Sequence, residues 1–268
     1  MNACEIHPTA IVDPKALLAE GVKIGPYCVV GPNVEIGEDT ELHAHVILDG
    51  HMTIGKNNKF FQFCSIGAPP QDLTYNGEPT RVEIGDNNIF REYVSIHRGT
   101  MKDQKVTIIK NDCLLMAHAH IGHDVVLGNR CVIVNSVNFA GHVKVGDRTI
   151  IGGGTNISQF VSIGRGAYLG GASAIDRDIP PFCTAYGNRA RLKGINIIGL
   201  RRHEFDRQMI TEVVDFYRAM ESSAYAPRAF VEHEEMLTEF FTNENEVIQE
   251  LIDFVKKSEI GIAPFMSS

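Results

Sequence analysis

The stretch that decides the fold is IGPYCVVGPNVEIGEDTELHAHVIL, residues 24–48, in which an apolar residue returns at every sixth position. Outward from this stretch, the same spacing covers residues 6–66 without a gap. It resumes in phase over 84–96 and, after one shift of frame, continues over 109–175. A period of six fits neither an amphipathic helix nor a single alternating strand, and it indicates a repeat architecture.

Two further regularities describe the inside of the repeat. Gly often follows the apolar residue, as in Ile24-Gly25 and Ile36-Gly37, and a small or β-branched residue stands four positions after it. Gly supplies backbone freedom at tight corners, and a narrow interior admits one aliphatic and one small side chain per edge. Three hexapeptides then close one triangular coil, and the coils stack as parallel strands in a β-helix.

Two segments depart from the repeat. Residues 67–83, GAPPQDLTYNGEPTRVE, are rich in Pro, Gly and polar residues and predict a loop. After Pro180-Pro181 the apolar residues take helical spacing instead. The stretches with this spacing are 203–221, 227–241 and 246–257. We predict an all-β parallel β-helix over residues 1–186, with the loop at 67–83, followed by a small α-helical domain over 187–268.

Composition excludes several classes of protein. The 268 residues carry a formal net charge of −8, which argues against nucleic acid as the main partner. There is no apolar run of about 18 residues and no signal-peptide pattern in the first ten, so we expect no transmembrane segment and a cytoplasmic location. The six Cys form no Cys-X-X-Cys pair, and four of them occupy the small inward position of the repeat, where a thiol acts as a compact apolar group.

The residues that a hexapeptide does not need carry the chemical information. The densest group is MAHAHIGHD at 116–124, followed by AGH at 140–142. One coil has about 18 residues, so His123 and His142 should lie on adjacent coils about 5 Å apart, with His120 near the same edge. An imidazole accepts a proton near neutral pH, and an adjacent Asp124 fixes its tautomer. Acid–base catalysis on a bound substrate is the favoured interpretation.

Two other interpretations of these histidines remain open. They can be surface residues of turns in a β-helix that has no catalytic function. They can also bind Zn²⁺ with an open fourth position, as in a lyase of the gamma carbonic anhydrase type.

A basic segment follows the repeat in a chain that is otherwise acidic. Its cations are Arg189, Arg191, Lys193, Arg201, Arg202 and Arg207. Either they form a solvated face, or they bind a phosphate or an acidic protein. Gly187-Asn188 and the Gly194 to Asn196 stretch alternate with these charges, which favours the binding interpretation.

The sequence resembles, from end to end, the acyl-carrier-protein-dependent UDP-N-acetylglucosamine O-acyltransferases that start lipid A biosynthesis. The resemblance rests on blocks outside the hexapeptides, which are IHPTA (6–10), QDL (71–73), GEPTRVEIG (77–85), IHRGT (96–100), AHIGHD (119–124), AGHV (140–143), GN (187–188) and GIN (194–196). It implies that the β-helix is left-handed, which the six-residue period alone does not show. It also implies direct transfer of a long 3-hydroxyacyl chain from acyl carrier protein to the 3-position of UDP-N-acetylglucosamine, in a homotrimer, without a metal or cofactor.

The resemblance assigns roles to single residues. His123 matches the general base, Asp124 the residue that orients it, and Gly141 the N–H that stabilises the oxyanion. Substrate contacts are implied for Asp72, His120, His142, Gln159, Asn196 and Arg202. Gly171 matches the position that limits acyl length, and its lack of a side chain predicts tolerance of a long chain.

Three positions depart from the family pattern. Thr74 stands where Lys is common, Ser158 where His is common, and Ile198 where an acidic residue is common. None of these three departures affects the assignment of His123 as the general base. They bear on nucleotide and acyl recognition, and they leave open an acceptor sugar with an amine at position 3. Another hexapeptide-repeat acyltransferase, with a different acceptor sugar or with N-acylation, is thus the alternative function.

Overall fold

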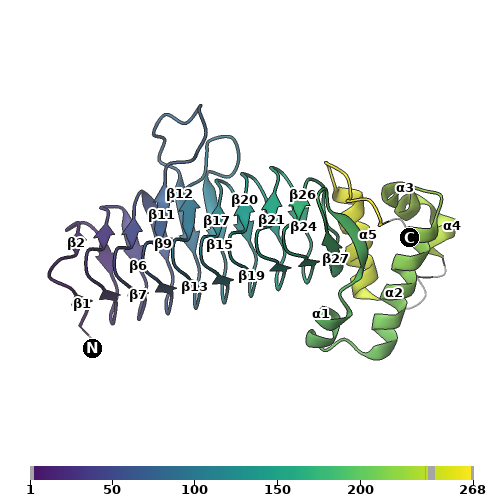
Figure 1. Cartoon of the computed structure of the whole chain (residues 1–268), viewed down its shortest axis with the longest axis horizontal. Coiled ribbons are helices and arrows are strands. Elements are labelled where there is room, and N and C mark those ends of the chain that lie inside the picture. Colours follow the sequence, from purple (N-terminus) through teal and green to yellow (C-terminus); the bar gives the residue numbers. More distant parts are fainter. Residues whose placement is uncertain (1–2, 239, 241–244, 267–268) are drawn as a thin grey trace.

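The computed structural model describes residues 3–238, 240 and 245–266. Figure 1 shows a long rod of stacked coils with the N-terminus at one end and helices at the other. Two loops project from one side of the rod near its middle. The rod is built from three sheets that are parallel except for one antiparallel pair at the end of the first, and each coil contributes a short strand to each sheet in turn.

The strands of each sheet are as follows. The first sheet contains β1 (Glu5–Ile6), β4 (Lys23–Ile24), β7 (Glu41–Leu42), β10 (Lys59–Phe60), β13 (Ile89–Phe90), β16 (Leu114–Leu115), β19 (Val132–Ile133), β22 (Ile150–Ile151), β25 (Tyr168–Leu169), β27 (Cys183–Tyr186) and β28 (Arg191–Ile195). The second contains β2 (Ile11–Val12), β5 (Val29–Val30), β8 (Ile47–Leu48), β11 (Ser65–Ala68), β14 (Ser95–His97), β17 (His120–Ile121), β20 (Asn138–Phe139), β23 (Asn156–Ile157) and β26 (Ala174–Ile175). The third contains β3 (Leu17–Leu18), β6 (Val34–Ile36), β9 (His51–Ile54), β12 (Arg81–Ile84), β15 (Val106–Ile109), β18 (Val126–Leu127), β21 (Lys144–Val145) and β24 (Ser162–Ile163).

The residues of the six-residue period point into the prism. Paired strands keep them in register, so that Ile121 lies beside Phe139 and Phe60 beside Phe90. The two Phe rings stack at 4.5 Å between centroids. In the two-residue strands, the residue before each inward one points out of the prism and is exposed or half-buried, because successive side chains of a strand face opposite sides of the sheet. The predicted small inward slot is also confirmed, because Cys28, Cys64, Cys113 and Cys131 are all buried.

Both projecting loops are insertions at the same corner, between the second and the third sheet. Strands β11 and β12 extend into the predicted loop of residues 67–83, so the loop proper covers 69–80. Arg81 to Ile84 pair with β9 and β15, which explains why these residues are strand. The loop lengthens one coil without removing any of its strands. Coil partners such as Asn58 and Asn88 are 30 residues apart, whereas partners on ordinary coils are 18 residues apart.

The second loop lies between β14 and β15. Here coil partners such as Ser95 and His120 are 25 residues apart, which is seven more than the ordinary 18. Because seven is not a multiple of six, this insertion shifts the frame of the sequence period.

Helices follow the β27–β28 hairpin, and several of them occupy the predicted positions. They are α1 (Ile197–Arg202), α2 (Arg207–Ser222), α3 (Pro227–Glu232), α4 (Glu234–Leu237) and α5 (Glu246–Lys257). Helix α2 starts later than its apolar pattern predicts because Asp206 caps it, accepting a hydrogen bond from the Met209 N–H at 2.8 Å. The division into domains 1–186 and 187–268 stays a prediction. Across the described ranges, no helix combines the length and hydropathy of a bilayer span.

Candidate active site

The predicted catalytic residues lie on the corner that carries the two loops. His123 and Asp124 form the turn between β17 and β18, and Gly141 and His142 form the same turn one coil later. Asp124 and His142 occupy equivalent positions and both have a left-handed backbone, with φ of 58° and 65°. Because His123 precedes Asp124, the two imidazoles lie on adjacent coils and meet edge to face, with ring centroids 4.9 Å apart and the ring planes at 84°. The spacing that the sequence predicts is confirmed.

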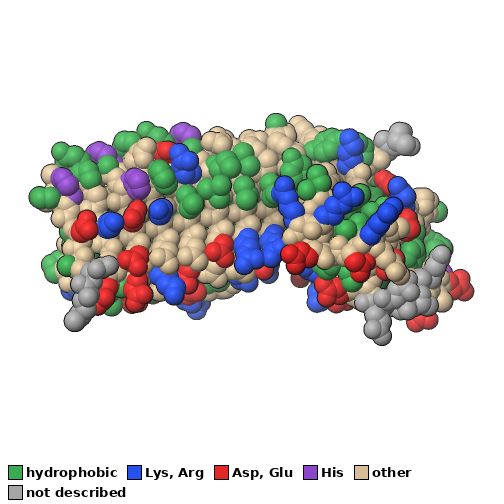
Figure 2. Space-filling view, turned by 90° about the horizontal axis from the view of Figure 1, so that it is seen from below, with side chains coloured by type: hydrophobic (Ala, Val, Ile, Leu, Met, Phe, Trp, Pro, Cys, Tyr) green, Lys and Arg blue, Asp and Glu red, His purple; other side chains and the backbone are tan. Residues whose placement is uncertain are grey.

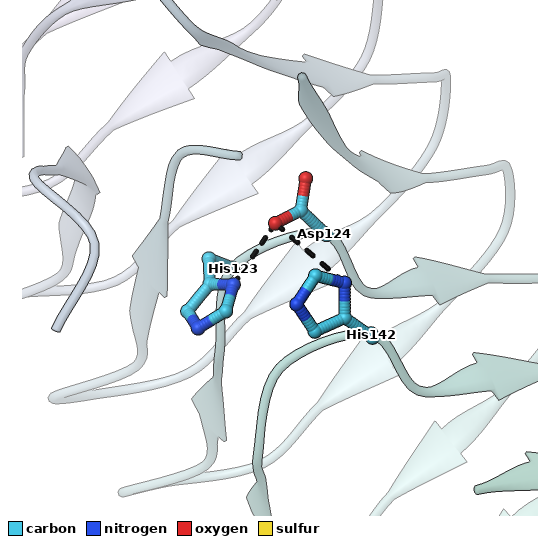
Figure 3. Close-up of side chains that lie close together, drawn as sticks. All are labelled: His123, Asp124 and His142. Atoms are coloured by element: carbon cyan, nitrogen blue, oxygen red, sulfur yellow. Dashed lines mark hydrogen bonds and ion pairs between the residues drawn. The ribbon is translucent and has the colours of Figure 1, made fainter. Parts of the chain in front are cut away.

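Asp124 is a buried carboxylate held by several donors. Figure 3 shows its oxygen facing both imidazoles. The Nδ1 of His123 lies 2.9 Å from Asp124 Oδ2, and the Thr100 N–H and hydroxyl donate to the same carboxylate at 3.0 and 2.7 Å. Burial acts to raise the pKa of Asp124, but the hydrogen bonds from His123 and Thr100 outweigh it and hold the pKa below its ordinary value.

An ionised Asp124 determines the proton position on His123. The carboxylate only accepts, so Nδ1 of the neutral ring carries the hydrogen and Nε2 keeps its lone pair. His123 is only 7% exposed, so little of its ring is open to solvent. An imidazole in this state is suited to remove a proton from a bound hydroxyl group.

Gly141 packs against the His123 ring. A Cβ at this position would stand 2.3 Å from Cε1 and 2.6 Å from Nε2 of His123, so no side chain fits without moving the imidazole. Among the described residues, the Gly141 N–H donates to no acceptor. Its free donor lies beside the predicted base, where a developing oxyanion needs one.

His142 has a carboxylate partner that sequence reasoning missed. Its Nδ1 lies 3.1 Å from Asp103 Oδ2 and 3.9 Å from Asp124 Oδ2. On its other side the ring stacks on Phe160 at 4.6 Å. The turn geometry and these neighbours hold the imidazole beside the His123 and Asp124 pair.

His120 lies on the second sheet, next to this corner. Its Nδ1 is 2.8 Å from the Ser95 hydroxyl, and its ring meets the edge of His97 at 4.8 Å. Burial lowers the pKa of both rings, and with His120 and His123 nearby the pKa of His97 falls to about 4. Both imidazoles are therefore neutral at pH 7, so each can donate one hydrogen bond and accept another.

Asp72 reaches the corner through the loop of residues 69–80. Lys102 Nζ is 2.6 Å from its Oδ2, and the Thr74 N–H and hydroxyl each lie 2.8 Å from its Oδ1. The hydrogen bond from Lys102, followed by those from Thr74, holds the pKa of Asp72 well below its usual range. Gln159 is exposed at the turn that follows Gly141 by one coil.

The remaining predicted residues lie elsewhere on the prism. Gly171 is exposed in the turn between the first and second sheets. Asn196 and Arg202 line a cavity of about 880 Å³ on the outer face of the first sheet, together with Arg130, Arg148 and Tyr168. Figure 2 shows this side of the molecule, turned away from the loops, with Lys and Arg gathered where the prism meets the helices. One chain does not bring these residues to His123.

Asn196 also has a structural task that the sequence did not reveal. Its side-chain oxygen caps α1 by accepting from the Gly199 N–H at 2.9 Å, and its amide donates to the Gly166 carbonyl at 2.9 Å. The side chain is thus fixed at the edge of the cavity.

The zinc interpretation can be weighed on the hydrogen bonds. His123, Asp124 and His142 offer ligand atoms within 4.8 Å of one another. However, the Asp124 oxygens already accept hydrogen bonds from Thr100 and His123. Nδ1 of each imidazole is hydrogen-bonded to a carboxylate, that of His123 to Asp124 and that of His142 to Asp103. These bonds engage Nδ1 of both rings and leave Nε2 of each ring to take a proton or a cation, so metal analysis of the purified protein is the test between the two interpretations.

Comparison with known proteins agrees with the geometry. Residues 178–263 match the second domain of UDP-N-acetylglucosamine O-acyltransferases, and residues 3–37, 15–50 and 107–141 match bacterial transferase hexapeptide repeats. The solved structure of LpxA from Acinetobacter baumannii is 43% identical, with 96% of this chain and 99% of that chain covered and a TM-score of 0.92. The UDP-N-acetylglucosamine O-acyltransferase of Moraxella catarrhalis is 43% identical over the same shares, with a TM-score of 0.91. The UDP-N-acetylglucosamine acyltransferase of Francisella novicida is 35% identical, over 97% and 94%, with a TM-score of 0.90.

These matches confirm the predicted fold class, a left-handed parallel β-helix followed by helices. They also confirm the prediction that the chain is an acyltransferase. An end-to-end likeness of this depth, together with an ordered His and Asp pair on the loop-bearing corner, places the chain in the family of UDP-N-acetylglucosamine O-acyltransferases.

Proposed function

We propose that the protein transfers a long 3-hydroxyacyl chain from acyl carrier protein to the 3-hydroxyl of UDP-N-acetylglucosamine, as the first step of lipid A biosynthesis in the cytoplasm. The observation that carries this proposal is the buried Asp124 bonded to His123 at 2.9 Å, with Gly141 against the ring. Family membership supplies the class of acceptor and reaction.

The reaction is a direct transfer. His123 Nε2 removes the proton of the 3-hydroxyl while the hydroxyl oxygen attacks the thioester carbonyl carbon. The Gly141 N–H donates to the oxyanion, and Asp124 stabilises the imidazolium. The C–S bond then breaks, and His123 returns the proton to the leaving thiolate. This sequence uses neither a Ser or Cys nucleophile nor a metal or diffusible cofactor.

Substrate binding divides between two parts of the surface. His120, His142, Asp72 and Gln159 contact the sugar and its substituents on the loop-bearing corner. Asn196 and Arg202 bind the nucleotide or its phosphates from the cavity on the first sheet, where Arg130 and Arg148 add positive charge. Gly171 leaves room for a long acyl chain.

A homotrimer brings these parts together. Because the cavity lies on the first sheet and His123 on the opposite corner, each site joins the corner of one protomer to the face of its neighbour. The basic segment of residues 189–207 receives the acidic carrier protein, and that attraction weakens as salt rises.

The test is turnover of UDP-N-acetylglucosamine with 3-hydroxyacyl carrier proteins of several chain lengths. His123→Ala should abolish transfer, whereas His51→Ala, on the exposed side of β9, should leave it unchanged. Unchanged turnover in His123→Ala would reject the base assignment. Stoichiometric zinc that is needed for activity would reject the direct mechanism in favour of metal chemistry, and acylation only of a 3-amino sugar would correct the acceptor.

A further inference from the structure

The loop of residues 98–105, which we call the bridging loop, contacts both sides of the candidate active site. Its Thr100 donates to Asp124, as described above. The next charged residues, Lys102 and Asp103, are adjacent in the chain and opposite in charge, and each reaches a different group of the site. Neither residue belongs to the repeat or to the blocks that identify the family.

Lys102 fixes the Asp72 carboxylate. Its ammonium takes Oδ2 at 2.6 Å, while Thr74 takes Oδ1 with two donors, so both oxygens and hence the plane of the carboxylate are held. The Lys102 side chain is 52% exposed. An ion pair this exposed adds little to folding stability, so its main effect is on the orientation of Asp72.

Asp103 fixes the His142 imidazole. Its Oδ2 lies 3.1 Å from Nδ1, whereas Asp124 Oδ2 stands at 3.9 Å and already accepts from His123 and Thr100. Since a carboxylate only accepts, the neutral His142 carries its proton on Nδ1 and presents the Nε2 lone pair. With Phe160 stacked on the ring, both the tautomer and the plane of His142 are set.

We propose that Lys102 and Asp103 are positioning residues of the acyl-transfer site, Lys102 orienting Asp72 and Asp103 orienting His142. This inference rests on the proposed function for the roles of Asp72 and His142. Because the two residues are consecutive, the bridging loop places the sugar-binding groups of the neighbouring loop and of the next coil in a fixed relation to His123.

The kinetic test starts from the parent enzyme with UDP-N-acetylglucosamine and an acyl carrier protein. Lys102→Met should raise KM for the sugar nucleotide about tenfold with kcat little changed, because a substrate contact is misplaced and the base is intact. Lys102→Arg should restore KM. Asp103→Asn should lower kcat/KM about tenfold, because the amide no longer fixes the Nδ1–H tautomer and the orientation of His142. Gln104→Ala, in the same exposed loop, is the matched control and should behave as the parent.

Double variants distinguish positioning from a general effect on the loop. If Lys102 acts through Asp72, Lys102→Met should have no further effect in an Asp72→Asn background, and Asp103→Asn none in a His142→Ala background. Effects that multiply in the double variants, single variants within twofold of the parent, or an equal loss in Gln104→Ala would each overturn the proposal.

A second readout is independent of activity. The ¹⁵N shifts of the His142 ring should report the Nδ1–H tautomer in the parent protein and a changed tautomer ratio in Asp103→Asn. An unchanged ratio overturns the assignment of Asp103. A parent enzyme without turnover would instead refute the proposed function, while the tautomer measurement would still decide whether Asp103 positions His142.

Discussion

Replacing Gly141 by Ala tests the geometry of the site with one methyl group. The new Cβ would start 2.3 Å from His123 Cε1, whereas ordinary contact begins at 3.4 Å. The imidazole must therefore move by about 1 Å, a displacement that costs on the order of 100-fold in rate when the moved group performs the chemistry. The overpacking itself costs about 1–3 kcal/mol of folding free energy, so the variant should fold with a Tm a few degrees lower.

The assay is thiol release from the acyl carrier protein at saturating and at low UDP-N-acetylglucosamine. We expect kcat to fall with KM nearly unchanged, because the sugar contacts do not depend on the His123 ring position. Gly31→Ala is the matched control, since its Cβ meets its nearest atoms at 3.4–3.7 Å on the same corner of an earlier coil. If Gly141→Ala retains more than a third of parent activity, His123 is not the base in the position described.

Three further predictions follow from the same residues. Asp124→Asn should lower kcat by on the order of 10³–10⁴, because an amide that donates to Nδ1 moves the proton to Nε2; steady-state kinetics giving less than a tenfold loss would contradict the base assignment. The pKa of His97 is lowered to about 4, so the folded state binds fewer protons than the unfolded state and loses stability as pH falls from about 6.5 to 4. His97→Gln should remove about 2–3 kcal/mol of that acid-induced loss, measured by denaturant unfolding at pH 7 and 4.5, and an unchanged pH dependence would refute it. Gly171→Met should shift preference to shorter acyl chains in a panel of carrier proteins, and an unchanged preference would remove position 171 from the acyl groove.

The periodic part of the fold was predictable because one rule repeats. Each buried aliphatic at the sixth position, such as Ile121 beside Phe139, meets its own equivalent one coil away, so local pattern and tertiary contact are the same information. The coil length of 18 residues likewise predicted that His142 lies on the coil next to that of His123. Counting in coils gave wrong element boundaries where the coil length changed. The C-terminal end of the predicted 67–83 loop is strand because Arg81 to Ile84 pair with strands on both sides, a fact that local composition does not contain.

The residues around the site were predictable only where the repeat placed them. Thr100 and Asp103 reach Asp124 and His142 from an irregular loop, and no spacing rule relates them to their partners. Thr107 also escaped notice, although its hydroxyl accepts from the Asp124 N–H at 2.9 Å, because a Thr on a strand has the ordinary residue type for its position. The IHRGT block that ends in Thr100 was the one available signal, since a hexapeptide does not require it.

The shape of a prism is the reason why we propose a site that is shared between two protomers. The three sheets face outward in three directions, so a groove cannot form between two faces of one coil stack. His123 stands at the corner between the second and third sheets, whereas the cavity with Asn196 and Arg202 lies on the first sheet. Rotating one copy about a threefold axis places a corner against the next copy's face, which turns two open surfaces into one cleft. In the proposed trimer, a site that takes His123 from an Arg202→Ala chain and Arg202 from a His123→Ala chain is therefore intact. Mixed trimers of Arg202→Ala and His123→Ala chains should recover activity that neither homotrimer has.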